Sequence, residues 1–175
     1  MLTLANFLTF IRLTLILPGA YAICSQMWYW AAGIFVIAVA SDIGDGIAAR
    51  RLQQSSRFGA LFDHTTDALF VSVNLTAFVF VGLIPYCLPI LIVLAFAQYV
   101  LDSKVLTGQP LRMSILGRYN GIAYFVLLGI AVAHNLPGLQ WISGQLIYAI
   151  GWVLIISTVL SIMDRAWAYM EVKRR

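Results

Sequence analysis

The stretch "SDIGDGIAARRLQQSSRFGALFDHTTD", residues 41–67, places four aspartates and three arginines within a chain in which 62% of the residues are hydrophobic. Residues 42, 45, 46 and 49 follow the helical spacing i, i+3, i+4, i+7, so Asp42 and Asp45 would share one face of a helix. Residues 59, 63 and 67 step by four, which would place Asp63 and Asp67 on one face of the next helix. Two adjacent helices can therefore direct four carboxylates at one point.

The rest of the chain has the composition of a membrane protein. Its mean hydropathy is +0.91 and only 10% of its residues are charged, whereas about a quarter of the residues of a soluble domain are charged. Arg12 interrupts the first apolar run and no cleavage site follows it, so this run is expected to remain in the protein. We predict an all-α integral membrane protein in which residues 1–175 form a single domain with six transmembrane helices. The apolar runs that approach the length of a membrane span are residues 7–24, 28–48, 60–84, 86–106, 116–134 and 141–163.

The distribution of basic residues predicts the orientation of these helices. Arginines and lysines lie between the second and third runs, between the fourth and fifth runs, and at the end of the chain, whereas the connections "SQMW", "IPYC" and "HNLPGLQ" contain none. By the positive-inside rule, both termini and the 50–58 connection face the cytoplasm, in a bacterial-type inner membrane. This topology accounts for the net charge of +4, so the charge does not require nucleic acid as a partner.

The two cysteines, Cys24 and Cys87, both fall at the non-cytoplasmic ends of predicted helices. They are either free apolar residues or the two halves of a disulfide, if that side of the membrane is oxidising. The sequence does not decide between these two alternatives.

Four carboxylates that meet in a medium of low dielectric constant repel one another, so they must take up protons, pair with arginines or bind cations. Oxygen ligands on two rigid helices suit Mg²⁺, with Mn²⁺ or Ca²⁺ as alternatives. Two ions about 3.5–4 Å apart are the usual arrangement for phosphoryl chemistry. The alternative is a structural network in which the aspartates pair with Arg50, Arg51 and Arg57. We favour the metal site, because such a network does not need carboxylates repeated at helical spacing on two successive helices.

The same residues carry a resemblance to a known family. The run from Asp42 to Asp67 fits the pattern D-x2-D-G-x2-A-R-x8-G-x3-D-x3-D at every fixed position, and it resembles the signature of the CDP-alcohol phosphotransferase family. The segment "NFLTFIR", residues 6–12, is similar to the N-x2-T-x2-R pattern at the start of the first helix in that family. The resemblance implies a membrane enzyme that moves a substituted phosphate from a CDP-linked lipid, such as CDP-diacylglycerol, to an alcohol and releases CMP.

This resemblance implies a role for each matching position. Asp42, Asp45 and Asp63 would hold two Mg²⁺ or Mn²⁺ ions, and Asp67 would contact one ion and act as general base. The residues support these roles, because metals that bridge a diphosphate neutralise charge on the leaving CMP and a carboxylate can take the proton of the acceptor hydroxyl. The resemblance also implies a nucleotide-binding set, which consists of Asp42, Gly46, Ala49, Arg50 and Gly59.

The sequence gives less information about the acceptor alcohol. Through "ARRLQQSSRFGALFD" the chain looks most like phosphatidylglycerophosphate synthases, which predicts glycerol 3-phosphate as the acceptor. Those synthases usually have a proline after the third aspartate, a lysine after the fourth and a later "GKxKT", where this chain has His64, Ala68 and "GRYNG" at 117–121. Inositol phosphate, serine or another alcohol therefore stay open. The candidates for binding the acceptor are Arg118, Arg112 and Lys104, which could instead be basic anchors at the membrane surface.

Two further expectations concern packing. By helical phase, His64 is expected to point away from Asp63 and Asp67 and to act as a packing residue. Members of the family that the chain resembles are commonly homodimers, so we predict a homodimer whose sites open sideways to the lipid. Small residues that would let helices approach closely across an interface are Gly129, Ala131, Ala133, Gly144, Ala149 and Gly151.

A different class of function is a divalent-cation channel or transporter, in which the aspartates form a translocation site. This alternative explains why four aspartates lie in an apolar chain. It does not explain the fixed spacing of Gly46, Ala49, Arg50 and Gly59, nor the lack of carboxylates within the last two predicted spans. Release of CMP from a CDP-lipid would distinguish the enzyme from the channel.

Overall fold

The computed structural model describes residues 4–51, 57–102 and 115–174, with side chains described within 6–47, 59–101 and 115–167. The described residues are helical apart from short turns, as the sequence predicts. One helix forms in each of the six apolar runs, and the last helix continues well past its predicted end. The helices are α1 (Leu4–Cys24), α2 (Trp28–Arg51), α3 (Arg57–Phe80), α4 (Cys87–Asp102), α5 (Ile115–His134) and α6 (Gly144–Arg174).

Four of these helices, α1, α2, α5 and α6, are long and apolar enough to cross a membrane. The apolar part of α4, Cys87–Leu101, is shorter. The 24-residue helix α3 is not among the apolar spans, because polar residues such as Asp63, Asp67 and Asn74 interrupt it. Protein covers most of the surface of these polar groups, since α3 packs against α1, α4 and α5. The protein is thus an integral membrane protein whose central helix carries several polar residues.

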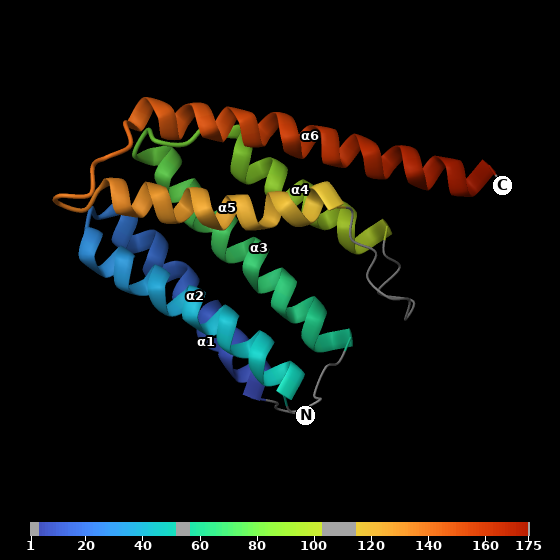
Figure 1. Ribbon diagram of the computed structural model, residues 1–175, viewed down its shortest axis with the longest axis horizontal. Coiled ribbons are helices and arrows are strands. Elements are labelled where there is room, and N and C mark those ends of the chain that lie inside the picture. Colours follow the sequence, from blue (N-terminus) through green and yellow to red (C-terminus); the bar gives the residue numbers. More distant parts are fainter. Residues whose placement is uncertain (1–3, 52–56, 103–114, 175) are drawn as a thin grey trace.

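The helices form a bundle that is closed at one end and splayed at the other (Figure 1). α1 packs along α2 and α3, while α6 packs along α4 and α5. The turns from α1 to α2, from α3 to α4 and from α5 to α6 gather at the closed end. The first residues of α1 and the last residues of α6 lie at the splayed end (Figure 1). Because the aspartates lie late in α2 and early in α3, the bundle places them toward the splayed end.

The turn after α3 shows how a helix stops at the closed end. The Gly82 N–H donates to the Val79 carbonyl at 3.0 Å, and the Leu83 N–H donates to the Phe78 carbonyl at 3.1 Å. This pair of hydrogen bonds requires a left-handed residue after the last helical turn. Gly82 supplies it with a φ of 83°, because a residue without a Cβ adopts this conformation at little cost.

Several of the small residues predicted for a dimer interface instead pack inside the chain. A Cβ atom at Gly151 would lie 2.6 Å from Pro85 Cδ, and one at Gly129 would lie 2.9 Å from the Phe35 ring. Ala131 is fully buried. These residues let α5 and α6 approach their own neighbours, so they are not evidence for a dimer, which stays a prediction.

Both cysteines are free in the structure. Cys24 is exposed at the end of α1, whereas Cys87 is half-buried at the start of α4. Of the two alternatives that the sequence left open, the structure therefore favours unbonded cysteines at the closed end of the bundle.

We predict that Gly151→Ala destabilises the protein by about 1–3 kcal/mol, because the new methyl group would overlap the rigid Pro85 ring. The matched control is Gly33→Ala, since nothing lies within 4 Å of a Cβ at that position. Thermal unfolding in detergent micelles measures both changes. An unfolding temperature of the Gly151→Ala protein equal to that of the Gly33→Ala protein would contradict this account of the α6 contact.

Candidate functional site

The four aspartates of the 41–67 stretch meet at one place. Carboxylate oxygens of Asp42, Asp45 and Asp63 all lie within 4.8 Å of one another. A second group with the same spacing contains Asp63, His64 and Asp67. The predicted convergence of α2 and α3 is confirmed, and Asp63 belongs to both groups.

A fully buried arginine from α1, Arg12, lies among these carboxylates. Its Nη2 atom is 2.6 Å from Asp45 Oδ2 and 3.1 Å from Asp42 Oδ1. Its Nη1 atom is 3.2 Å from Asp63 Oδ1 and also pairs with Asp67. Arg12 therefore joins three helices, because each of its terminal nitrogens contacts carboxylates of α2 or of α3.

Sequence reasoning missed this partner. It considered the arginines of the 50–57 segment, whose side chains lie outside those that the structure describes. The signal was present in "NFLTFIR", since Thr9 and Arg12 are three residues apart and share one face of α1. The Thr9 hydroxyl also reaches the cluster, because it donates to Asp45 Oδ2 at 3.3 Å.

The charges of the cluster fit a divalent cation. With all groups ionised, four carboxylates face one guanidinium, so the ion pairs of the described residues leave three negative charges without compensation. The Asp45 side chain is only 6% exposed, and those of Asp63 and Asp67 are 28% and 23% exposed. Partly buried carboxylates of this kind attract hard cations such as Mg²⁺ and Mn²⁺. The residues present therefore fit the predicted metal.

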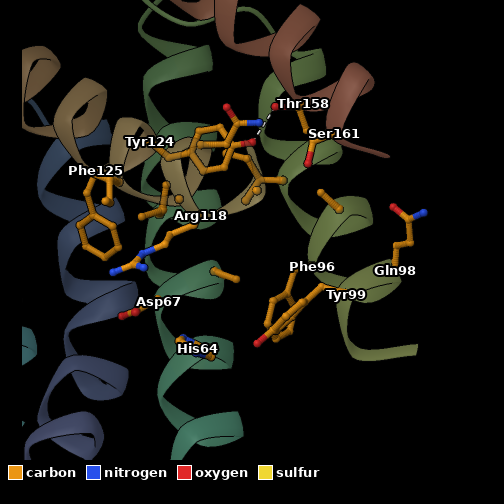
Figure 2. A pocket seen from close by; sticks show the side chains of 18 of the residues that line it. His64, Asp67, Phe96, Gln98, Tyr99, Arg118, Tyr124, Phe125, Thr158 and Ser161 are labelled. Carbon is orange, nitrogen blue, oxygen red and sulfur yellow. Dashed lines mark hydrogen bonds between the residues drawn. The ribbon is translucent and has the colours of Figure 1, made fainter. Parts of the chain in front are cut away.

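A cavity of about 610 Å³ adjoins the carboxylates. Asp42, Asp63 and Asp67 lie on one side of it, and α4, α5 and α6 supply the remaining walls. In Figure 2 the Arg118 side chain extends from α5 between the Asp67 side of the cavity and the Tyr124 and Thr158 side chains. Apolar side chains cover much of the wall, among them Val71, Ile92, Phe96, Ile122, Phe125 and Ile162.

The remaining predicted site residues divide into three groups. Arg118, a predicted acceptor-binding residue, lines the same cavity as three of the aspartates. Gly46 on α2 and Gly59 on α3 lie on the two helices that carry the carboxylates. Four others are not described in full: Ala49 and Arg50 belong to α2 without described side chains, and Lys104 and Arg112 lie outside the described residues.

The expectation for His64 was wrong. His64 lines the cavity, and one of its ring nitrogens lies within 4.8 Å of carboxylate oxygens of Asp63 and Asp67. The reason is helical phase, because residues three apart, such as His64 and Asp67, share a face of a helix. The His64 ring also meets the Tyr99 ring edge-on, with 6.0 Å between the ring centroids.

The apolar bundle and its carboxylate cluster define an integral membrane protein with a candidate phosphoryl-transfer site. The chain belongs to the CDP-alcohol phosphatidyltransferase family, whose model matches residues 2–163. This range includes Arg12, all four aspartates and Arg118, so the resemblance inferred from the sequence is confirmed. Enzymes of this family are phosphatidyltransferases of phospholipid biosynthesis that use a divalent metal, and the clustered carboxylates can supply its ligands.

The chain is similar to several bacterial proteins. A CDP-diacylglycerol--glycerol-3-phosphate 3-phosphatidyltransferase of Bacillus subtilis (strain 168) is 30% identical over 140 residues, which are 79% of this chain and 70% of the relative. A candidate cardiolipin synthase of Mycobacterium tuberculosis (strain ATCC 25618 / H37Rv) is 40% identical over 86 residues, 49% of this chain and 41% of the relative. The chain therefore spans about two fifths of the length of that mycobacterial relative. No solved structure matches the chain.

We predict that Arg12→Gln lowers the free energy of unfolding by about 3 kcal/mol or more, because it leaves four carboxylates without their buried cation. Thermal unfolding in EDTA measures this loss. Mg²⁺ should raise the unfolding temperature of Arg12→Gln more than that of the natural protein, since the variant cluster carries one more uncompensated negative charge. Arg12→Lys is the matched control, because lysine keeps the positive charge but cannot contact carboxylates through two terminal nitrogens as arginine does.

The opposite result would be an Arg12→Gln protein that unfolds in EDTA at the same temperature as the natural protein. That result would mean that the positive charge of Arg12 does not stabilise the carboxylate cluster.

Proposed function

We propose that the protein transfers a phosphatidyl group from CDP-diacylglycerol to a small alcohol and releases CMP. The observation that carries this proposal is the convergence of the four signature aspartates, three of which lie in the wall of one cavity. The family membership supports the same chemistry. A carboxylate cluster at the edge of a cavity can bind the diphosphate through cations while an alcohol approaches from the cavity side.

Asp42, Asp45, Asp63 and Asp67 are the proposed metal ligands, and two Mg²⁺ or Mn²⁺ ions per site are the proposed occupants. When bound, these ions neutralise charge on the diphosphate and on the leaving CMP. Arg12 holds the four carboxylates in place through its ion pairs. The proposed nucleotide contacts come from the same helices and consist of Asp42, Gly46, Ala49, Arg50 and Gly59.

Asp67 is the proposed general base. Its side chain is 23% exposed and lines the cavity from which the alcohol would arrive. The hydroxyl oxygen of the acceptor attacks the phosphorus that carries the diacylglycerol, the bond from that phosphorus to the CMP oxygen breaks, and the hydroxyl proton passes to Asp67. The products are a new phosphodiester and CMP.

Glycerol 3-phosphate is the proposed acceptor. The names of the Bacillus subtilis relative and of a Yersinia pestis (strain Pestoides F) relative, 40% identical over 78 residues, both contain this acceptor. Arg118 in the cavity wall provides a cation for its phosphate, and Arg112 and Lys104 are further candidates. The mycobacterial relative is named for cardiolipin synthesis, so a phospholipid headgroup is an alternative acceptor, besides inositol phosphate and serine.

We also propose that the splayed end of the bundle faces the cytoplasm, with both termini on that side, and that the protein forms a homodimer. The distribution of basic residues supports the orientation. The site would then open sideways to the bilayer for the acyl chains of the lipid and toward the cytoplasm for a soluble acceptor. Mass measurement in mild detergent tests the dimer, and a fully active monomer would contradict it.

Purified protein with CDP-diacylglycerol, Mg²⁺ and glycerol 3-phosphate should release CMP. Excess EDTA should abolish the release and Mg²⁺ or Mn²⁺ should restore it, because the clustered carboxylates cannot hold the diphosphate without cations. Each acceptor is assayed separately by chromatography of CMP. Undiminished CMP release in EDTA would contradict the metal site. Divalent-cation uptake into proteoliposomes without any CMP release would favour the transporter alternative.

Asp67→Asn should slow CMP release by roughly 10²-fold or more, because the amide cannot accept the acceptor proton. CDP-diacylglycerol binding should change little. Asp42→Asn and Asp45→Asn are the matched comparisons, and they should weaken Mg²⁺ binding more than Asp67→Asn does. Single-turnover rates at saturating Mg²⁺ separate the two effects. If Asp67→Asn released CMP at the rate of the natural protein, Asp67 would not be the general base.

A further inference from the structure

The side chain of Asn120 on α5 has an unsatisfied hydrogen-bond donor in the cavity wall. Asn120 is 5% exposed and lines the cavity. Its Oδ1 atom accepts a hydrogen bond from the Ser157 hydroxyl of α6 at 2.6 Å. Its Nδ2 atom is buried and finds no partner among the described residues. A buried donor is costly unless something accepts from it, so a ligand oxygen is expected there.

Hydroxyl groups line the same cavity as this amide. The Tyr124 hydroxyl lies 2.6 Å from Thr158 Oγ1, and Ser161 is 4% exposed in the same wall. Figure 2 shows Tyr124, Thr158 and Ser161 at one end of the cavity and Asp67 and His64 at the other. We call Asn120, Tyr124, Thr158 and Ser161 the neutral end. A ligand there meets the amide of Asn120 and the hydroxyl groups of Tyr124, Thr158 and Ser161.

Two arginines, Arg118 and Arg165, line the cavity among the described residues. Arg118 is exposed and precedes Asn120 by two residues on α5. Arg165 follows Thr158 by seven residues on α6, which is roughly 10 Å along the helix axis, and its guanidinium lies 4.8 Å from the Tyr99 ring centroid. A buried phosphate needs cationic partners. The phosphate of an acceptor is therefore expected near Arg118 and Arg165, and an uncharged oxygen at the neutral end.

A second unsatisfied atom in the cavity wall supports an uncharged ligand group. The amide of Gln98 on α4 donates from Nε2 to the Ile162 carbonyl at 3.0 Å. Its Oε1 atom is buried and has no partner among the described residues. A phosphate dianion has no hydrogen to donate to this oxygen, whereas a hydroxyl both donates and accepts. Two residues of the cavity wall thus each contain a buried amide atom, one donor and one acceptor, without a partner among the described residues.

We propose that Asn120 is a specificity-determining residue, which donates a hydrogen bond to a second hydroxyl of the acceptor, next to the hydroxyl that reacts at Asp67. The site then takes a glycerophosphoryl acceptor, whose phosphate lies toward Arg118. This inference rests on the proposed transfer function. The same glycerophosphoryl chemistry occurs in free glycerol 3-phosphate and in the headgroup of phosphatidylglycerol. From the sequence, Asn120 was noted only because it stands where phosphatidylglycerophosphate synthases have the second lysine of "GKxKT".

The test uses two pairs of acceptors that differ by one hydroxyl. The soluble pair is glycerol 3-phosphate and 3-hydroxypropyl phosphate, and the lipid pair is phosphatidylglycerol and phosphatidylpropane-1,3-diol. In the pair that the enzyme uses, kcat/KM for CMP release should be at least about 10²-fold higher for the member with the second hydroxyl, because a buried polar group left unpaired strongly disfavours the analogue. Release of CMP with the soluble pair identifies free glycerol 3-phosphate as the acceptor, and release with the lipid pair identifies the headgroup of phosphatidylglycerol. Equal kcat/KM values within that pair would overturn the proposal.

Variants locate the preference at residue 120. Asn120→Leu keeps the approximate volume and removes the donor, so the preference should fall to within a few-fold. The exposed neighbour Tyr119 provides the control Tyr119→Phe, which should keep the full preference. If Asn120 instead faced the phosphate, Asn120→Lys would lower KM for both members of a pair and leave their ratio intact. That result would refute the hydroxyl contact.

A binding measurement separates failure of this inference from failure of the proposed function. Calorimetric titration with both pairs, the lipids as short-chain forms in detergent, is done in the presence of Mg²⁺ and CMP. If no acceptor releases CMP, the transfer function fails, and tighter binding of the hydroxylated member, lost in Asn120→Leu, would still support the contact. Equal binding within both pairs, or no binding of any member, would contradict it.

Discussion

The structure depends on one buried interaction, the contact of Arg12 with four carboxylates. Arg12 reaches from α1 to Asp42 and Asp45 on α2 and to Asp63 and Asp67 on α3. Carboxylates in an apolar bundle require a compensating charge. A single guanidinium is enough to hold three helices together but too little to neutralise the cluster. The same contact therefore fixes the N-terminal half of the fold and leaves negative charge available for cations.

The position of α3 connects this charge cluster to the cavity. One face of α3 carries Asp63 and Asp67 toward α1 and α2, and the helix also packs against α4 and α5. Residues of α2, α3, α4, α5 and α6 line a cavity of about 610 Å³ beside the cluster. A polar helix is acceptable in this membrane protein because other helices surround it. The fold thus brings carboxylates, arginine side chains and hydroxyl groups to the wall of one cavity.

The sequence predicts the charge cluster more fully than the cavity. The spacing of the aspartates along two helices is enough to predict their convergence, since helical periodicity places i, i+3 and i+4 on one face. Arg12 is distant in sequence from the aspartates, and only its place in an apolar run and in the N-x2-T-x2-R pattern pointed to it. His64 was predicted to point away from both Asp63 and Asp67, although its three-residue separation from Asp67 places these two residues on one face of α3.

The cavity could not be predicted because it depends on how α4, α5 and α6 pack together. Asn120 and Ser157 are 37 residues apart in sequence, and nothing in their local patterns indicates that they meet. The small residues of α5 and α6 were open to two interpretations in the same way. Only the packing shows that Gly129 and Gly151 contact Phe35 and Pro85 of their own chain.

The central claim is that the carboxylate cluster between α2 and α3 holds divalent cations for phosphatidyl transfer. Anomalous diffraction from crystals of the protein grown with Mn²⁺ and CDP-diacylglycerol tests this claim most directly, because it locates the manganese without reference to activity. The account predicts Mn²⁺ bound by oxygens of Asp42, Asp45, Asp63 and Asp67, beside the diphosphate. Manganese bound elsewhere, with Arg12 still paired to all four aspartates in the presence of the nucleotide lipid, would contradict it.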